Sequence, residues 1–374
     1  MTIRIFREKV SKIMKTFKIG AILATLLCIV FLAGCSSNTS NSGTQSSDTS
    51  NSTAEKVASV DTKTVYVTPS WLNSAMNGDQ KGYEKLTILE VVYDDSANRG
   101  TYDDGHIKGA ILAADVDVED ADGTQERPYN LLPASEMEKN ILKRGITKDT
   151  KVVLYGADIS GVARVAYAYL WAGVEDVKIL NGGIDAWKSA GYETEKTSNS
   201  AKSASSFGTT IPAHPEYWTS MTEAKNKLAT DSNFKLVSIR SEAEWLGTSS
   251  GYSYIQRAGE PEGAVWGKGA KTASDVADFT NDDGTVKNLS GLQEVWKDCN
   301  FTLQNQLAFY CGTGWRACVP FLVLYENGYA NISLYDGGWY EWQMYSDNPV
   351  QVGDPTSESC QHTTVSALPT DKAA

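Results

Sequence analysis

The residues with the clearest chemical potential lie between Cys311 and Arg316, in the order Cys-Gly-Thr-Gly-Trp-Arg. The apolar run Gln306–Tyr310 before them is typical of a buried strand, and a helical pattern follows them. Gly312 and Gly314 let the backbone curl so that successive N–H groups point inward. Because the following helix adds its positive end, the segment predicts a cradle that stabilises a thiolate on Cys311 without a general base. Arg316 closes the loop and can hold a charged oxygen of a substrate.

The length of this loop discriminates between two kinds of chemistry. Loops that bind a tetrahedral oxyanion in phosphatases and arsenate reductases are one residue longer than this one, in which four residues separate Cys311 from Arg316. The tighter loop better fits a single sulfur atom on the cysteine. A cysteine at a strand end is often only a small buried hydrophobe, but the glycines and the arginine favour a catalytic Cys311. Phosphatase or arsenate-reductase chemistry is the less favoured alternative.

Three sequence motifs occur twice, in the same order and at nearly the same spacing. The matched segments are Gly105–Ile111 with Gly259–Val265, Val152–Gly156 with Leu307–Cys311, and Asn181–Trp187 with Asp336–Trp342. Gly105 to Gly156 is 51 residues and Gly259 to Cys311 is 52, and the third motif follows 26 residues later in both copies. This shared register indicates a duplicated domain.

Each copy alternates short apolar runs with helical patterns, which predicts an α/β domain with a parallel sheet and helices on both faces. The strands expected in the second copy are Phe234–Ile239, Ala264–Trp266, Gln306–Tyr310 and Ile332–Tyr335, and the helices include Ser290–Lys297 and Arg316–Tyr325. Ligands bind beyond the carboxyl ends of such strands, where Cys311 lies. The predicted organisation is a signal (1–34), a tether (35–58), a first domain (59–195), a linker (196–210), a second domain (211–350) and a loose tail (351–374).

The Gly-His-Ile-x-Gly-Ala element at Gly105, the cysteine loop and the Gly-Gly-x-x-x-Trp element together resemble the rhodanese family. The duplication is similar to that of the tandem thiosulfate and mercaptopyruvate sulfurtransferases, over about residues 60–345. The resemblance implies that Cys311 takes the outer sulfur of a small anionic donor such as thiosulfate and passes it, from a persulfide, to cyanide or a thiol. It implies no cofactor. The persulfide would be held by the loop, which consists of Gly312, Thr313, Gly314, Trp315 and Arg316.

The two copies differ where this chemistry would occur. The first copy has Gly156 at the position of the cysteine and Gly161 at the position of the arginine, so we expect it to be catalytically inactive. In the second copy, Ser238-Ile239-Arg240 lacks the acidic residue of the Asp-x-Arg that commonly ends this strand in active domains. Arg240 is therefore either a substrate-binding residue or a structural salt-bridge partner behind the loop.

Acidic residues near the loop leave the identity of the donor open. Glu244 stands where tandem members often have a substrate-binding arginine, and Glu260-Pro261-Glu262 replaces the usual His-Ile-Pro. We expect these side chains in a region that ordinarily meets an anionic donor. Gly312 is typical of mercaptopyruvate-type loops, whereas a loop that ends in Arg316 is typical of many single-domain members.

The N-terminal segment has the pattern of a secretory signal. Six basic residues precede an apolar run from Ile19 to Ala33, and Leu32-Ala33-Gly34-Cys35 resembles the bacterial lipobox, which implies a lipid on Cys35. The Ser-, Thr- and Asn-rich stretch that follows predicts a flexible tether. We therefore expect an extracytoplasmic protein, anchored to the bacterial cell membrane or outer membrane by this lipid alone. An uncleaved N-terminal anchor is the alternative.

The formal net charge of −12 becomes −17 once the signal, which carries a net +5, is removed. A body this acidic is a poor candidate for binding nucleic acid or anionic lipid headgroups. The cysteines form no Cys-x-x-Cys pair, and no clustered set of Cys and His ligands is visible, so no metal site is expected. The sequence thus predicts a sulfurtransferase that acts through Cys311. The alternative is a non-catalytic rhodanese-like lipoprotein that binds a partner or carries sulfide.

Overall fold

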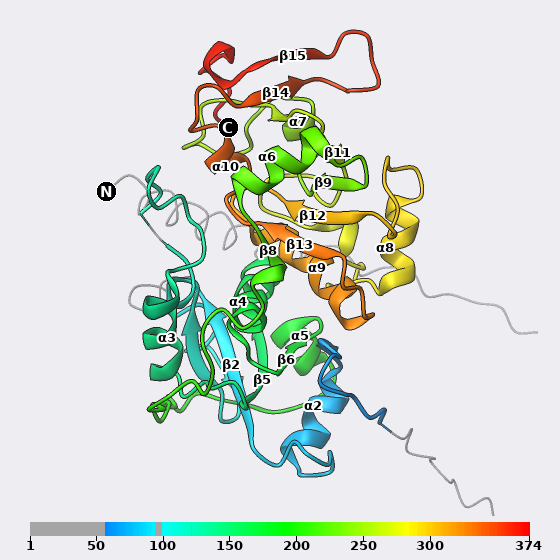
Figure 1. The fold of residues 1–374 in the computed structure, drawn as a ribbon. Helices are drawn as coiled ribbons and strands as arrows, with labels where there is room; N and C mark the ends of the chain where they lie inside the picture. Colours follow the sequence, from blue (N-terminus) through cyan, green and yellow to red (C-terminus); the bar gives the residue numbers. More distant parts are fainter. Residues whose placement is uncertain (1–56, 94–98, 121) are drawn as a thin grey trace, which may run out of the picture. The chain divides into compact units, whose positions relative to one another are not determined.

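The computed structural model describes residues 57–93, 99–120 and 122–374 (Figure 1). The predicted signal, Cys35 and nearly all of the predicted tether lie outside these residues. In the described part, the chain forms two five-stranded parallel sheets, one in each copy of the sequence repeat. No helix among the described residues is long and apolar enough to span a bilayer.

The two sheets have the same strand order, which confirms the predicted fold class of two α/β domains. The first sheet has the order β1-β6-β5-β2-β4 and the second β8-β13-β12-β9-β11, with all neighbours parallel. The first sheet consists of β1 (Tyr66–Val67), β2 (Leu86–Val92), β4 (Ile111–Ala114), β5 (Lys151–Gly156) and β6 (Asp176–Leu180). The second consists of β8 (Trp218–Thr219), β9 (Phe234–Ser238), β11 (Val265–Trp266), β12 (Gln306–Tyr310) and β13 (Ile332–Tyr335).

Helices connect these strands. The first domain contains α2 (Pro69–Met76), α3 (Ala134–Lys143), α4 (Ile159–Ala172) and α5 (Gly183–Ser189). The second contains α6 (Met221–Thr230), α7 (Glu242–Trp245), α8 (Leu289–Trp296), α9 (Trp315–Glu326) and α10 (Gly338–Trp342). The strands and helices predicted for the second copy agree with these bounds to within one residue at each end.

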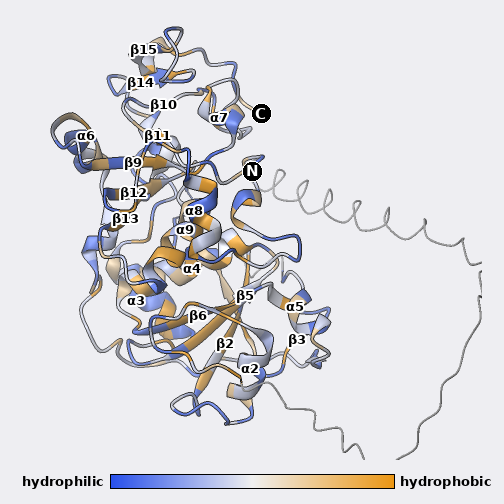
Figure 2. Ribbon diagram, turned by 90° about the vertical axis from the view of Figure 1, so that its right-hand side faces the viewer, coloured by the Kyte–Doolittle hydropathy of each residue, from blue (hydrophilic) through white to orange (hydrophobic). Residues whose placement is uncertain are grey.

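Alternate residues of the central strands pack into different cores, as expected for a sheet that is covered on both faces. In β5, Val152 and Leu154 belong to the core on the α4 side, whereas Val153 and Tyr155 pack with Trp187 of α5 and with residues of α2. Figure 2 shows the apolar residues concentrated along β2, β5 and β6 and along α4.

The core on the α4 side continues from the first domain into the second. Helix α4 packs against α9, and the rings of Tyr167 and Phe321 meet edge to face with their centroids 5.0 Å apart. The linker predicted at 196–210 contains no helix or strand, but Phe207 within it is fully buried in the same core. The two domains therefore share apolar packing along the helix that follows the cysteine loop.

Two antiparallel sheets complete the fold. In the first domain, β3 (His106–Ile107) pairs with β7 (Thr194–Glu195), and in the second, β10 (Glu260–Pro261) pairs with β14 (Pro349–Val352). The segment predicted to be a loose tail differs from that expectation, because β15 (Gln361–Thr364) pairs with β14 and the Lys372 N–H donates to the Gln256 carbonyl at 3.0 Å. Backbone pairing does not require apolar side chains, so the polar composition of the tail gave no sign of it.

Candidate active site

Cys311 lies directly after β12, at the carboxyl end of the central strand of the second sheet, and α9 begins four residues later. The cysteine is almost fully buried, with 1% of its surface exposed. Gly312 and Gly314 are buried, whereas Thr313 and Trp315 are half-buried. The structure thus places the predicted loop at the edge of the sheet where parallel α/β folds bind their ligands.

In the backbone of the loop, three carbonyl groups accept hydrogen bonds, whereas three N–H groups find no acceptor in the described part of the chain. The Cys311 carbonyl accepts from the Trp339 N–H and the Gly312 carbonyl from the Tyr340 N–H, both at 2.9 Å. The Gly314 carbonyl accepts from the Cys318 thiol at 3.1 Å. By contrast, the N–H groups of Gly312, Thr313 and Gly314 donate to no acceptor among the described residues. Together with the first turn of α9, these donors form a site for an anionic atom on the cysteine.

The Gly-Gly element of the second copy sets this backbone geometry. Gly338 has a positive φ of 55°, and a Cβ on it would lie 2.4 Å from the Cys311 carbonyl oxygen and 2.7 Å from that of Gly312. Gly314 has a φ of 84°, and a Cβ there would lie 2.8 Å from the Asp336 carbonyl oxygen. Only glycine permits these approaches, so the third repeated motif holds the cysteine loop in position.

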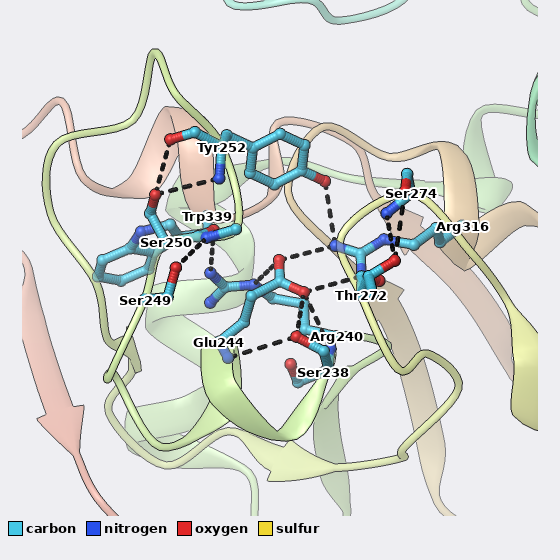
Figure 3. Close-up of polar contacts among 12 residues, drawn as sticks. Ser238, Arg240, Glu244, Ser249, Ser250, Tyr252, Thr272, Ser274, Arg316 and Trp339 are labelled. Carbon is cyan, nitrogen blue, oxygen red and sulfur yellow. Dashed lines mark hydrogen bonds and ion pairs between the residues drawn. The ribbon is translucent and has the colours of Figure 1, made fainter. Parts of the chain in front are cut away.

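Arg316 binds a carboxylate rather than facing an empty space (Figure 3). Its Nη1 and Nη2 donate to the two oxygens of Glu244 at 2.9 and 2.8 Å, and Nη2 also donates to the Tyr252 hydroxyl at 3.0 Å. The guanidinium and the carboxylate are 3% and 1% exposed. The Tyr252 ring lies against Gly312, because a Cβ on that glycine would come within 2.4 Å of the ring. Tyr252 therefore packs over the loop and fixes the arginine.

Arg240 is fully buried and forms further ion pairs, and Figure 3 shows it beside Glu244. It donates to Glu260 at 2.8 Å and to Glu244 at 3.2 Å, and Glu260 also accepts from Ser238 and Tyr310. Of the two roles open to Arg240, the contacts correspond to the structural salt bridge. Glu260 supplies to Arg240 the carboxylate that Ser238 cannot provide.

The two carboxylates of this network differ in their proton affinity. Burial works to raise the pKa of Glu244, but Arg316 and Arg240 outweigh it and lower the pKa to about 2. Burial raises the pKa of Glu260 to about 7, although Arg240 opposes this shift. Glu244 is therefore a permanent anion at neutral pH, whereas Glu260 titrates near neutrality.

Trp315 connects the loop to the first domain. Its indole stacks on the ring of Tyr93 with centroids 5.2 Å apart and planes within 7°, and its Nε1 donates to Glu119 at 2.5 Å. A Cβ on Gly161 would lie 3.1 Å from the indole. An arginine at Gly161, the counterpart of Arg316, would collide with this ring. The glycine that replaces the arginine in the first copy thus makes room for the loop of the second.

The first copy has no space for a nucleophile at the matching position. A Cβ on Gly156 would lie 2.6 Å from the Val91 carbonyl oxygen and 3.0 Å from the side chain of Val162. Two residues after Gly156, the Asp158 carboxylate caps α4 by accepting a hydrogen bond from the Ser160 N–H at 2.8 Å. The second copy alone therefore carries the cysteine site.

The remaining cysteines lie apart from this chemistry. Cys318 is fully buried in α9, and burial raises the pKa of its thiol well above the ordinary value. Cys299 and Cys360 are half-buried, and the pKa of each thiol is raised by burial. Among the described residues, no group of three or more His, Cys, Asp or Glu side chains is arranged to hold a metal ion.

The chain belongs to the rhodanese family, because residues 68–190 and 220–345 each match the family described as the Rhodanese-like domain. It is 37% identical over 294 residues to the thiosulfate sulfurtransferase YnjE of Escherichia coli (strain K12). The match covers 78% of this chain and 66% of that protein. A crystal structure of YnjE superposes with a TM-score of 0.72 at 37% identity, over 77% of this chain and 68% of the other.

A second kind of solved relative acts on a different compound. The anaerobic ergothioneine biosynthesis enzyme from Chlorobium limicola, in complex with its natural substrate trimethyl histidine, superposes with a TM-score of 0.72 at 32% identity. The match covers 78% of this chain and 71% of that one. Both relatives span the two domains, so the family assignment covers most of the described residues.

Sequence reasoning missed the residues of the first domain that contact the loop. Tyr93 and Glu119 lie in no motif, and nothing in their local sequence relates them to Trp315. Gly161 was the only sign in the sequence that another segment packs at this point, since a glycine at the position that matches Arg316 leaves space for a neighbouring side chain.

Proposed function

We propose that this rhodanese-family protein transfers a sulfane sulfur from a donor such as thiosulfate to cyanide or a thiol, through a persulfide on Cys311. The Cys311 thiolate attacks the outer sulfur of thiosulfate, the S–S bond breaks, and sulfite leaves with the electron pair. Cyanide then attacks the outer sulfur of the persulfide, which yields thiocyanate and restores the thiolate. Atoms and charges balance in both steps without a cofactor.

One observation carries this proposal. The carbonyl groups of Cys311 and Gly312 are bound by the backbone of α10, which leaves the N–H groups of Gly312, Thr313 and Gly314 without acceptors among the described residues. Unbound donors around a buried sulfur match the needs of a persulfide anion, whose outer sulfur requires hydrogen bonds in a site that excludes water. A pure binding module has no need of such an arrangement.

The test is the thiocyanate formed from thiosulfate and cyanide by the wild type and by Cys311→Ser. We expect turnover in the wild type and none above background in the variant, with the fold of both checked by circular dichroism. Equal product from both proteins would refute the role of Cys311. An inactive wild type that still binds a partner equally well after Cys311→Ser would favour the non-catalytic binding or sulfide-carrier function.

A second acceptor class is supported by the solved relatives. One of them is a variant of EanB with a tyrosine changed to phenylalanine and a cysteine persulfide, in a tetrahedral intermediate state with ergothioneine. That tyrosine precedes the persulfide cysteine by the same number of residues as Tyr252 precedes Cys311. The ring carbon of a histidine betaine would take the outer sulfur in place of its hydrogen, and Cys311 would return as a thiol. Mass spectrometry of trimethyl histidine after incubation with the persulfidated protein tests this acceptor.

Export and lipid attachment at Cys35 form a separate proposal. It is supported by the basic, apolar and lipobox-like segments of the sequence, which end at Leu32-Ala33-Gly34-Cys35. Labelled palmitate supplied to expressing bacteria should enter the wild type and not Cys35→Ser. Label in both proteins, or in neither, would contradict the proposal. The acidity of the chain also leads us to propose that it binds no nucleic acid.

A further inference from the structure

Arg316 of the cysteine loop, Arg164 beside it and Arg240, which shares the Glu244 carboxylate with Arg316, are all bound to carboxylates (Figure 3 for two of them). Arg316 pairs with Glu244 through both of its terminal nitrogens. Arg240 pairs with Glu260 and Glu244. On the opposite side, Arg164 of α4 lies next to Gly314 and pairs with Glu119 and Asp336.

These pairs are buried, so they neutralise the arginines instead of exchanging with solvent. The side chains of Arg316, Arg240 and Arg164 are 3%, 0% and 0% exposed. A sulfonate or carboxylate is ordinarily recognised by the two-pronged face of an arginine. In Arg316 that face is occupied by both oxygens of Glu244, and the Tyr252 hydroxyl bonds to the same nitrogen. A donor dianion would therefore have to displace a buried carboxylate.

We propose that Glu244 makes this site prefer low-molecular-weight persulfides of the form R–S–SH over dianionic thiosulfate as sulfur donors. In these persulfides, the group that leaves carries no charge besides that of its sulfur. This inference rests on the function proposed above. The hydrogen-bond donors that remain at the loop are the N–H groups of Gly312, Thr313 and Gly314. They suit one sulfur atom and not the three oxygens of a sulfonate. The loop holds the transferred sulfur, and Arg316, Arg240 and Arg164 already bind carboxylates of the protein in place of the remainder of an anionic donor.

The chemical step balances for this donor. The Cys311 thiolate attacks the outer sulfur of R–S–SH and forms the new S–S bond. The old S–S bond breaks, and R–S leaves with the electron pair and takes the donor proton to become R–SH. The charge ends on the outer sulfur of the Cys311 persulfide, which the loop N–H groups receive. No oxidant or reductant is needed.

The test compares the rates at which two donors load sulfur onto Cys311, measured by intact mass after rapid quenching. The donors are thiosulfate and 2-hydroxyethyl persulfide. Glu244→Gln removes the negative charge of the side chain at nearly constant shape, and so removes the ion pair that holds Arg316. We expect its loading rate from thiosulfate to rise by about tenfold to a hundredfold, the effect of one charged hydrogen bond, while the rate from 2-hydroxyethyl persulfide, whose leaving side is uncharged, changes little.

Glu262→Gln is the matched control. It removes the same charge from a side chain that is 43% exposed and pairs with His362, away from the loop arginines. It should alter neither rate. Arg257 makes no ion pair among the described residues, so it is the alternative anion site that the experiment has to exclude. If Arg257→Gln abolishes thiosulfate loading and Glu244→Gln gives no selective gain, the inference is overturned.

The wild type supplies a second measurement that requires no variant. Sulfate, an inert dianion, should fail to protect Cys311 from alkylation by iodoacetamide. Saturable protection by sulfate would overturn the inference even if Glu244→Gln did not fold. Absence of loading from both donors, in a folded protein with Cys311 reduced, would reject the proposed function itself. Loading from thiosulfate as fast as from 2-hydroxyethyl persulfide would reject only the selectivity.

Discussion

Substitution of Gly338 by alanine should inactivate the protein without unfolding it. The new Cβ would lie 2.4 Å from the Cys311 carbonyl oxygen, whereas an ordinary contact begins at 3.4 Å. The backbone at Cys311 would have to retreat by about 1 Å, and a misplacement of that size costs about a hundredfold in rate. We therefore expect sulfur loading on Cys311 to slow by about two orders of magnitude.

Gly328→Ala is the matched control for this experiment. Gly328 has a φ of 81°, close to the 55° of Gly338, but no atom lies within 4 Å of the position of its Cβ. Both variants incur the cost of a left-handed alanine, about 1–2 kcal/mol, and Gly338→Ala should lose more of the free energy of unfolding because its Cβ also clashes with the loop backbone. Only Gly338→Ala also displaces the loop.

The assay is the single-turnover loading of Cys311, followed by intact mass, with urea unfolding of both variants alongside. The reasoning predicts Gly338→Ala to be slow and Gly328→Ala to be close to wild type, with both proteins folded. A Gly338→Ala protein that loads sulfur at the wild-type rate would refute the claim that the Gly-Gly element sets the geometry of the loop. Equal slowing in both variants would refute it as well.

Three further outcomes follow from the site. Tyr93→Ala should slow sulfur loading by about fivefold, since stacking on Trp315 contributes about 1 kcal/mol. Tyr93→Phe should keep the stack and the rate, and identical rates for the two variants would separate the first domain from catalysis. The free energy of unfolding should fall as the pH drops below 4.5, because Glu244 has a pKa of about 2 in the folded protein and must be protonated. It should also fall as the pH rises from 4.5 to 7, because Glu260, with a pKa of about 7, resists ionisation in the folded protein. Thermal melts of Glu260→Gln should show a weaker loss of stability between pH 4.5 and 7. Cys318→Ala should keep full turnover and lose about 1 kcal/mol in urea unfolding, and a loss of turnover would give that thiol a redox role.

The sequence predicted the repeated fold and the cysteine loop well, for a physical reason. Strand β12 alternates between two buried cores, so its residues from Leu307 to Tyr310 are apolar, and Gly314 of the loop and Gly338 beside it adopt conformations that other residues avoid. Both requirements are local and leave a readable pattern. The predicted bounds of Gln306–Tyr310 therefore match the observed strand.

The partners of the loop could not be predicted in the same way. The acidic residues Glu244 and Glu260 were expected to face a donor, but they bind Arg316 and Arg240. Charge type can be read from the sequence, whereas pairing depends on the approach of segments far apart in the chain. The same limit hid the contact of Trp315 with the first domain.

The most direct test of the account is the intact mass of the purified, reduced protein after incubation with a sulfane donor, with the modified residue located by peptide mapping. We expect a gain of one sulfur atom on Cys311, its removal by cyanide, and no gain in Cys311→Ser. A gain of sulfur that persists in Cys311→Ser, or that maps to Cys318 instead, would contradict the central claim that the Cys311 loop carries the transferred sulfur.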